Sequence, residues 1–226
     1  MKHKAIIFDC DGVLIDSEVL SNQTDVELLA ELGIHLELSD YMQRFVGKSA
    51  KDVVAGVEQL LGHKLPADFS QRKETRVLVA FDRELKATPE IHTLLDHLAG
   101  LQTPVAVASG SSIKRLHHSL GLTGLQRYFG PHIYSAQMVE RGKPAPDLFW
   151  LTAKHLGVEA RNCLVIEDSL SGIVAAVAAG MTAIGFVGGS HIGPGHAERL
   201  LGSGALEVMA EMPKVLEWVQ TQWLIN

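Results

Sequence analysis

Short apolar runs alternate with longer segments of helical periodicity through most of this 226-residue chain. Such alternation is typical of a parallel α/β sheet, because strands buried on both faces form continuous apolar runs and each crossover needs a helix. We therefore predict strands at residues 5–8, 105–108, 132–135, 164–167, 183–186 and, more weakly marked, 205–208. Helices are expected between them at 90–100, 113–120, 146–156 and 172–179.

One interval breaks this alternation. Between residues 17 and 88 no buried strand is evident, and helical patterns cover 19–32, 39–45, 51–61 and 70–85. An all-helical block after the first strand indicates a second, smaller domain, since the chain is long enough for a core domain with an insert. We expect a core domain of residues 1–16 and 88–226 and a helical domain of residues 17–87.

Composition and charge limit the partners of the protein. A net charge of −6 argues against nucleic acid and anionic membranes, which both favour a basic surface. No segment approaches the roughly 20 apolar residues of a membrane span, and acidic residues interrupt the N-terminal apolar run too early for a secretion signal. We therefore expect a cytoplasmic protein with Cys10 and Cys163 as buried free thiols.

Two acidic residues follow the first predicted strand. Asp9 and Asp11 are separated by Cys10, and alternate side chains of a strand point to the same face. Two carboxylates placed so closely resist ionisation unless a cation lies between them. The alternative is an ordinary turn, because Asp11 and Gly12 form a common turn dipeptide.

Small hydroxyl residues follow the second predicted strand. Ser109, Gly110, Ser111 and Ser112 lead into a helix that begins at Ile113. Free backbone N–H groups and hydroxyls at a helix N-terminus form a phosphate cradle. The alternative is that Ser111 or Ser112 only caps the helix.

A lysine lies in a loop stiffened by two prolines, within the segment RGKPAPD at residues 141–147. Held in this way, Lys143 is suited to bind a phosphate as a point charge. The alternative is a solvated lysine in an ordinary turn.

Two carboxylates end the fourth predicted strand. Glu167 and Asp168 supply oxygen ligands of the kind that Mg²⁺ takes in proteins. Alternatively, Asp168 or Ser169 caps the next helix and no metal is needed.

These four groups lie at the carboxyl ends of predicted strands, where open α/β sheets bring their ligands together. Together they supply a nucleophilic carboxylate, a second carboxylate, a hydroxyl, a lysine and metal ligands. Phosphoryl transfer needs this set, because it depends largely on positioning and on charge neutralisation.

The four segments described above resemble the four motifs of the haloacid dehalogenase superfamily and follow one another in the same order. The resemblance is carried by the sequences DCDGVLIDSE, GKPAPD and IEDSLSG. They are most similar to the branch that contains β-phosphoglucomutase, phosphonatase and many small sugar-phosphate phosphatases. The resemblance spans essentially the whole chain. It implies a Rossmann-like parallel-sheet core with an inserted four-helix cap that closes over the substrate.

The resemblance also implies catalytic roles. Asp9 would be the nucleophile that forms an aspartyl-phosphate. Asp11 would protonate the leaving oxygen and then activate water. Ser109 and Lys143 would hold the transferring phosphoryl group, with Gly110 beside the substrate.

A metal site follows from the same resemblance. Mg²⁺ would be bound by Asp9, the backbone carbonyl of Asp11 and Asp168, with Glu167 assisting directly or through water.

Departures from the family pattern narrow the reaction. Dehalogenases of this fold lack a second aspartate at the position of Asp11. In β-phosphoglucomutase a cap histidine stands at the position of Ser21, and an arginine stands at the position of Ala50. The absence of both side chains from this sequence disfavours mutase activity. The cap lysine of phosphonatase has no evident equivalent early in the cap. A phosphatase is therefore predicted, with a phosphomutase or a non-catalytic phospholigand-binding protein as alternatives.

The leaving group should be recognised by the helical insert. We expect Arg44 or Lys48 to contact a hydroxyl-rich or anionic substrate, the alternative being that both are solvated cations at helix ends. The resemblance implies a small phosphorylated metabolite, such as a sugar phosphate or 6-phosphogluconate. A monomer or small homo-oligomer is expected.

A glycine-rich stretch at residues 188–195 differs from a dinucleotide-binding loop, because it lacks the full glycine spacing and follows a late strand. We predict a flexible surface loop there.

Overall fold

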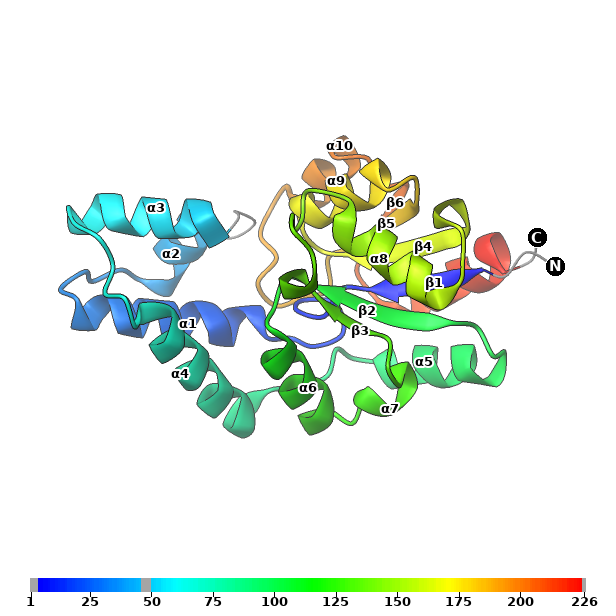
Figure 1. Cartoon of the computed structure of the whole chain (residues 1–226), viewed down its shortest axis with the longest axis horizontal. Coiled ribbons are helices and arrows are strands. Elements are labelled where there is room, and N and C mark those ends of the chain that lie inside the picture. The colour runs from blue at the N-terminus through cyan, green and yellow to red at the C-terminus, as the bar shows by residue number, and fades with distance from the viewer. Residues whose placement is uncertain (1–3, 46–49, 225–226) are drawn as a thin grey trace.

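The computed structural model of the chain describes residues 4–45 and 50–224. Within these ranges the chain forms a six-stranded parallel sheet with the order β3-β2-β1-β4-β5-β6 (Figure 1). The strands are β1 (Ala5–Phe8), β2 (Val105–Ser109), β3 (Ile133–Ser135), β4 (Cys163–Glu167), β5 (Thr182–Phe186) and β6 (Glu207–Met209).

The strand order confirms the predicted α/β fold. The chain places β1, β2 and β3 in one direction and then crosses to the other side of β1 for β4, β5 and β6. Open α/β sheets bind ligands beyond the carboxyl ends of the strands at such a reversal. A ligand-binding site is therefore expected at the carboxyl ends of β1, β2 and β4.

Helices cover both faces of the sheet (Figure 1). One face carries α5 (Ile91–Gly100), α6 (Ile113–Leu122), α7 (Gln126–Phe129) and α11 (Met212–Trp218), and the other carries α8 (Asp147–Leu156), α9 (Leu170–Ala178) and α10 (His196–Gly202). Short helical turns lie at Ala136–Met138 and Ala160–Asn162, and a π-helix lies at Val219–Trp223.

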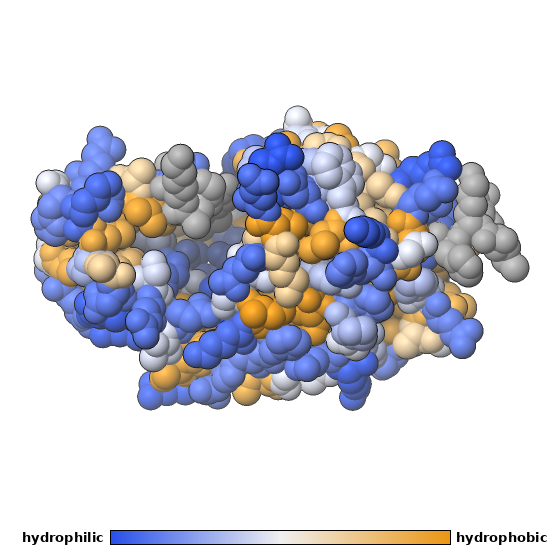
Figure 2. Space-filling model, in the orientation of Figure 1, coloured by the Kyte–Doolittle hydropathy of each residue, from blue (hydrophilic) through white to orange (hydrophobic). Residues whose placement is uncertain are grey.

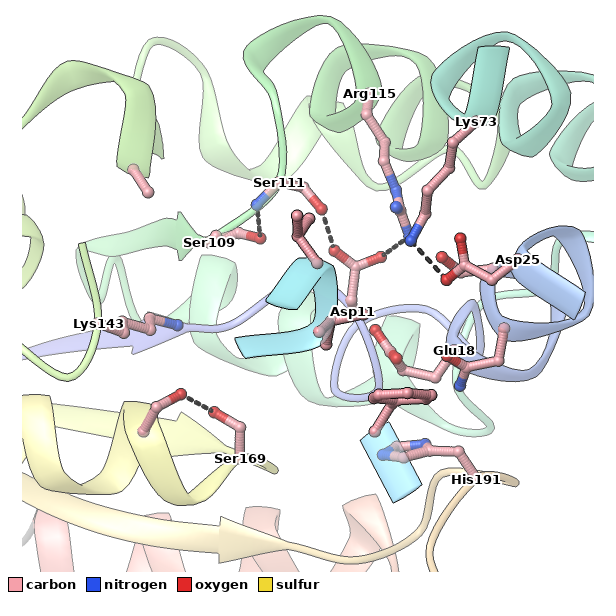
Figure 3. A pocket seen from close by; sticks show the side chains of 18 of the residues that line it. Asp11, Glu18, Asp25, Lys73, Ser109, Ser111, Arg115, Lys143, Ser169 and His191 are labelled. Atoms are coloured by element: carbon pink, nitrogen blue, oxygen red, sulfur yellow. Dashed lines mark hydrogen bonds and ion pairs between the residues drawn. The ribbon is translucent and has the colours of Figure 1, made fainter. Parts of the chain in front are cut away.

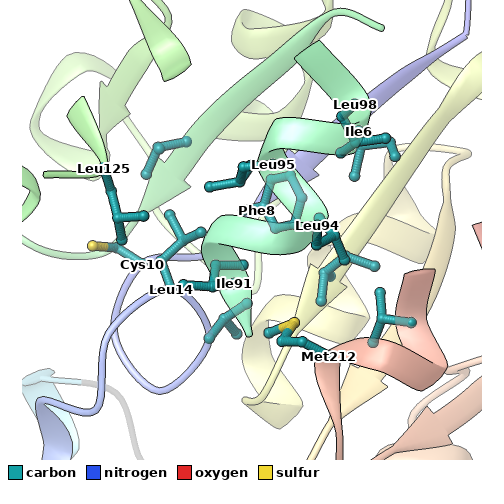
Figure 4. Packing of buried hydrophobic residues seen from close by; sticks show 14 of the residues in the cluster. Ile6, Phe8, Cys10, Leu14, Ile91, Leu94, Leu95, Leu98, Leu125 and Met212 are labelled. Carbon is teal, nitrogen blue, oxygen red and sulfur yellow. The ribbon is translucent and has the colours of Figure 1, made fainter. Parts of the chain in front are cut away.

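Strand β1 lies at the centre of this packing, because all four of its residues are fully buried. Its side chains alternate between the two faces. Ile6 and Phe8 pack with the apolar residues of α5 (Figure 4), whereas Ala5 and Ile7 join the cluster beneath α8 and α9. A strand buried on both sides is a rigid base for the residues that follow it.

The segment after β1 is helical, as predicted. It contains α1 (Glu18–Glu31), α2 (Leu38–Phe45), α3 (Ala50–Leu61) and α4 (Phe69–Glu84). These helices form an apolar cluster of their own, separate from the two clusters of the sheet, with Leu28, Leu29, Tyr41, Val57 and Phe69 among its buried residues. In Figure 1 they stand beside the sheet, beyond the carboxyl end of β1.

The chain leaves the sheet and returns to it through two segments that are hydrogen-bonded to each other. Asp16 N donates to Lys86 O at 3.0 Å, and Thr88 N donates to Leu14 O at 3.0 Å. The two crossings lie next to the predicted ends of the helical block at residues 17 and 87.

The last predicted strand is present, but its bounds differ from those predicted. We expected residues 205–208, but β6 spans Glu207–Met209. Ala205 instead closes the end of α10, because its backbone N–H donates to Leu200 O at 3.1 Å.

Cys10 and Cys163 are buried free thiols, as predicted. They belong to the apolar clusters on opposite faces of the sheet. Within the described ranges, no helix has the length and apolar character needed to cross a membrane.

Candidate active site

A cavity of about 550 Å³ lies between the carboxyl ends of the strands and the helical segment. The space-filling view shows the hollow between the two parts (Figure 2). The predicted residues of the core that line it are Asp9, Asp11, Ser109, Gly110, Lys143, Glu167 and Asp168. The structure therefore brings together the residues that the sequence placed at four separate strand ends.

Lys143 connects two of these strand ends. Its Nζ donates to Asp9 Oδ1 at 2.7 Å and to Glu167 Oε1 at 2.5 Å, and only 8% of its side chain is exposed. Burial alone would lower the pKa of Lys143, but the two carboxylates outweigh it and raise that pKa. The alternative of a solvated lysine in a turn is therefore wrong.

Three buried carboxylates form a cluster. One oxygen each of Asp9, Glu167 and Asp168 lies within 4.8 Å of the others. Burial raises the pKa of Asp9 well above its usual range, Lys143 opposes this, and the neighbouring carboxylates raise it further. The pKa of Asp168 is also raised, by burial first and then by Glu167. A divalent cation relieves such repulsion, and oxygen donors are those that Mg²⁺ prefers, so this donor set fits the ion.

Both carboxylate oxygens of Glu167 accept hydrogen bonds. Its Oε1 accepts from Lys143, and its Oε2 accepts from Ser169 N at 2.6 Å and Ser169 Oγ at 2.9 Å. A glycine must face it in α9, because a Cβ on Gly172 would lie 1.8 Å from Glu167 Oε1. Glu167 is therefore fixed as a partner of Lys143 and of the α9 N-terminus.

Asp11 lies apart from the three-carboxylate cluster. It accepts hydrogen bonds from Ser111 Oγ at 2.6 Å and Arg115 Nη2 at 2.9 Å (Figure 3). Ser17 Oγ donates a third hydrogen bond to it at 2.5 Å. Burial acts to raise the pKa of Asp11, but the charge of Arg115 and the two hydroxyl donors outweigh it and lower that pKa. The carboxylate form of Asp11 is thus stabilised.

The serines at and after the end of β2 have different roles. Ser109 is buried and its Oγ accepts from Ser111 N at 3.1 Å. Ser112 is the N-cap of α6, where its Oγ accepts from Arg115 N at 3.1 Å. The capping alternative is therefore correct for Ser112, while Ser109 and Gly110 face the cavity.

The end of β4 shows a similar division. Ser169 caps α9, with its Oγ accepting from Gly172 N at 3.0 Å. Asp168 is not the cap, and its side chain lines the cavity.

Of the two cations predicted to recognise the leaving group, Arg44 does not line the cavity. Arg44 is exposed near the end of α2, whose cavity-lining residues are Tyr41 and Phe45, one turn apart. Arg44 therefore lies on another side of the helix, which corrects the expectation that it faces the substrate. Lys48 lies outside the described residues.

The side chains that α1 and α4 bring to the cavity were not predicted from the sequence. Glu18, Asn22 and Asp25 of α1 line it together with Lys73 of α4. Asp25 Oδ2 accepts from Lys73 Nζ at 2.6 Å and from Tyr41 Oη at 2.8 Å. The polar spacing of residues 18, 22 and 25 on one helix face was the signal available in the sequence.

The surface-loop prediction at residues 188–195 is wrong at His191. This side chain is buried and lines the cavity, with Nε2 at 3.0 Å from Asp168 Oδ2. Room for the ring exists because Gly12 and Gly189 lack a Cβ beside it.

The chain matches the model of the haloacid dehalogenase-like hydrolase family over residues 3–180. It is 31% identical over 194 residues to the 6-phosphogluconate phosphatase of Escherichia coli K12, an alignment that covers 84% of this chain and 86% of that protein.

Solved structures show the same likeness. A conserved haloacid dehalogenase-like protein from Agrobacterium tumefaciens superposes with a TM-score of 0.83 at 38% identity, over 96% of this chain and 99% of that one. A haloacid dehalogenase family hydrolase from Deinococcus radiodurans, with bound phosphate and sodium, has a TM-score of 0.80 at 34% identity, over 99% and 98% of the two chains.

The fold and these matches define a hydrolase of the α/β class with its site at the strand ends. The chain belongs to the haloacid dehalogenase-like hydrolase family. Within that family it is a phosphomonoesterase.

Proposed function

We propose that this phosphomonoesterase hydrolyses a small sugar phosphate or phosphosugar acid, such as 6-phosphogluconate, through an aspartyl-phosphate on Asp9 with Mg²⁺ as cofactor. The observation that carries the proposal is the position of Asp9, whose carboxylate contacts Lys143 and lies in one cluster with Glu167 and Asp168. A nucleophile, a cation and a set of metal ligands are the parts that phosphoryl transfer requires.

The first half of the reaction transfers the phosphoryl group. A carboxylate oxygen of Asp9 forms a bond to phosphorus while the bond from phosphorus to the leaving oxygen breaks. Lys143 binds the phosphoryl oxygens as a fixed positive charge, and the buried Ser109 with the adjacent Gly110 supplies donors beside it. Asp11 passes a proton to the leaving oxygen, which departs as an alcohol. Because the contacts of Asp11 stabilise its carboxylate form, that proton comes from the monoprotonated phosphate ester when it binds.

The second half releases phosphate. A water attacks the phosphorus of the aspartyl-phosphate, and Asp11 accepts the proton of that water. The bond between phosphorus and the Asp9 oxygen breaks, which restores the carboxylate. The contacts of Asp11 with Ser17, Ser111 and Arg115 support this half, because they stabilise the ionised form that takes up a proton.

The metal ligands are assigned from the donor set. Asp9 and Asp168 would hold Mg²⁺ together with the Asp11 backbone carbonyl, and the ion would supply charge neutralisation at the phosphoryl oxygens. Glu167 takes an indirect role in this assignment, because both of its oxygens are occupied by Lys143 and Ser169.

We assign residues 17–87 to a cap domain over the core of residues 1–16 and 88–226. Its separate apolar cluster and the paired crossings at Asp16 and Thr88 support this division. The cap would exclude bulk water from the aspartyl-phosphate, because α1 and α4 form one wall of the cavity.

The test is a screen of the purified protein against phosphorylated metabolites with Mg²⁺, with inorganic phosphate as the readout. Wild-type protein should release phosphate from sugar phosphates and form a hydroxylamine-labile phosphoprotein. Asp9→Asn should lose both, while Asp147→Asn, outside the cluster, should keep them. Phosphate release by Asp9→Asn at the wild-type rate would exclude the proposed nucleophile.

A further inference from the structure

Two histidines that follow β5 contact the same aspartate. His191 Nε2 lies 3.0 Å from Asp168 Oδ2, and His196 Nε2 donates to the backbone oxygen of Asp168 at 2.6 Å. Both histidines are buried, with 7% and 5% of their surfaces exposed, and both line the cavity. The side chain and the backbone of Asp168 are thus held from one segment of the chain.

The place of the His191 ring is shaped by glycines. A Cβ on Gly12 would lie 2.0 Å from Asp168 Oδ2 and 2.8 Å from His191 Cε1. A Cβ on Gly189 would lie 2.7 Å from His191 Nδ1. These contacts are shorter than real Cβ atoms show, so any side chain at either position would displace the ring or the carboxylate.

The segment that carries His191 is fixed to the core. Ser190 donates to Asp16 Oδ1 from its backbone N at 3.1 Å and from its Oγ at 2.8 Å. His196 is in turn held at its Nδ1 by Arg199 Nη2 at 3.2 Å. His191 therefore reaches Asp168 from an anchored loop.

We propose that His191 is a positioning residue that holds the carboxylate of Asp168 ready for a divalent cation. The inference rests on the proposed function, in which Asp168 is a metal ligand. With Oδ2 beside the His191 ring, Oδ1 of Asp168 would remain available to hold the ion. Partners of this kind fix the orientation of metal-binding carboxylates, and their loss typically costs about 10- to 100-fold in metal affinity.

The second ring nitrogen of His191, Nδ1, is consistent with a ligand-binding site. Within the described part of the chain, His191 Nδ1 is buried and has no hydrogen-bond partner. Nδ1 is therefore available for a hydrogen bond with a polar group bound in the cavity, while Nε2 faces Asp168.

The experiment measures Mn²⁺ binding by calorimetry in the absence of any phosphate ester. His191→Leu and His191→Asn should bind Mn²⁺ about 10- to 100-fold more weakly than wild type, because neither side chain places a nitrogen at the position of Nε2 beside Asp168 Oδ2. His191→Gln should stay within about threefold of wild type, since its amide nitrogen can occupy that position. In an Asp168→Asn background, His191→Leu should cause no further loss.

Thermal unfolding in EDTA checks that each variant is folded. Folded His191→Leu and His191→Asn with wild-type affinity for Mn²⁺ would overturn the inference and leave the proposed phosphatase intact. Equal losses in Leu, Asn and Gln variants would also overturn it, because the rescue depends on a nitrogen placed beside Asp168 Oδ2, as His191 Nε2 is. Failure of wild-type protein to bind Mn²⁺ at all would remove the proposed cofactor, and the inference with it.

Discussion

Arg115 Nη2 lies 2.9 Å from Asp11 Oδ1, and the two side chains are only 10% and 11% exposed. The pair joins the first turn of α6 to the loop after β1, at the residue proposed as acid and base. The guanidinium also lies over the Phe81 ring of α4, 4.9 Å from its centre. One buried cation thus contacts the core, the helical segment and the reaction centre.

Replacing Arg115 by methionine should destabilise the fold by about 3–5 kcal/mol, because it leaves the buried Asp11 carboxylate without its partner. Urea unfolding at pH 7 measures this loss. Arg115→Lys keeps the positive charge, so its free energy of unfolding should decrease less. A methionine variant as stable as wild type would show that the pair contributes little.

The same pair predicts a pH dependence. Since the pKa of Asp11 is lowered from its ordinary value of 3.8, its contribution to stability is present above that value. It is lost as the pH falls through the lowered pKa of the folded state. As the pH drops below about 4, the urea concentration at the unfolding midpoint of wild type should therefore decrease. The midpoint of Arg115→Met should decrease less over the same pH range. Parallel curves for the two proteins would contradict the assignment.

Mg²⁺ should stabilise the folded protein, because it neutralises repulsion among Asp9, Glu167 and Asp168. At a concentration 100-fold above Kd the gain is about 2.7 kcal/mol, and for a chain of this size it raises Tm by roughly 5–10 °C. Differential scanning fluorimetry in Mg²⁺ and in EDTA measures the shift. Asp168→Asn should lose most of it, and the exposed Glu140→Gln should keep it.

A shift of equal size in Asp168→Asn would place the stabilising ion elsewhere. Absence of any shift in wild type, with the protein folded in both solutions, would exclude Mg²⁺ binding at that concentration.

The fold and the core residues of the site could be predicted because their signals are local. The apolar run of β1 ends directly at Asp9, so strand and candidate nucleophile appear together in the sequence. Lys143, Glu167 and Asp168 likewise sit in short motifs at the ends of predicted elements. Parallel topology then brings these ends to one edge without further information.

The residues that were missed depend on distant contacts. Arg115 is 104 positions from Asp11, and His191 reaches Asp168 only because two glycines leave room for its ring. One signal was present for Arg115, since a cation in the first turn of a helix opposes the helix dipole and needs a compensating anion. For His191 no comparable pattern exists in the sequence, because packing alone decides that the loop turns inward.

Gly172→Ala should destabilise the protein, although alanine is the better helix former. In an ordinary helix the change gains about 0.5–1 kcal/mol, but here the new Cβ would overlap the Glu167 carboxylate. Glu167 must then move, which disturbs its bond to Lys143. Both the urea concentration at the unfolding midpoint and kcat should decrease.

The control is Gly121→Ala in α6, where a Cβ would meet only Gln126 Oε1 at 3.6 Å. That variant should be as stable as wild type or more so, with unchanged kcat. If the two variants behave alike, the close approach of Glu167 to α9 does not limit this position.

Asn22 should contribute to recognition of the leaving group at the expense of stability. Its Nδ2 lies buried at the cavity and has no partner within the described residues. An unsatisfied buried donor costs about 1–3 kcal/mol, so Asn22→Ala should leave the free energy of unfolding unchanged or raise it. A ligand oxygen that accepts from Nδ2 would recover this cost on binding.

Comparing two substrates isolates this contact. For the best sugar phosphate of the screen, Asn22→Ala should raise KM by roughly 5- to 10-fold, the value of one lost hydrogen bond. For p-nitrophenyl phosphate, which presents the same phosphoryl group without hydroxyls, KM should stay within twofold. Gln23→Ala, exposed on the same helix, should affect neither substrate. An equal rise in KM for both esters would assign Asn22 to the phosphoryl group, because that group is the part the two substrates share.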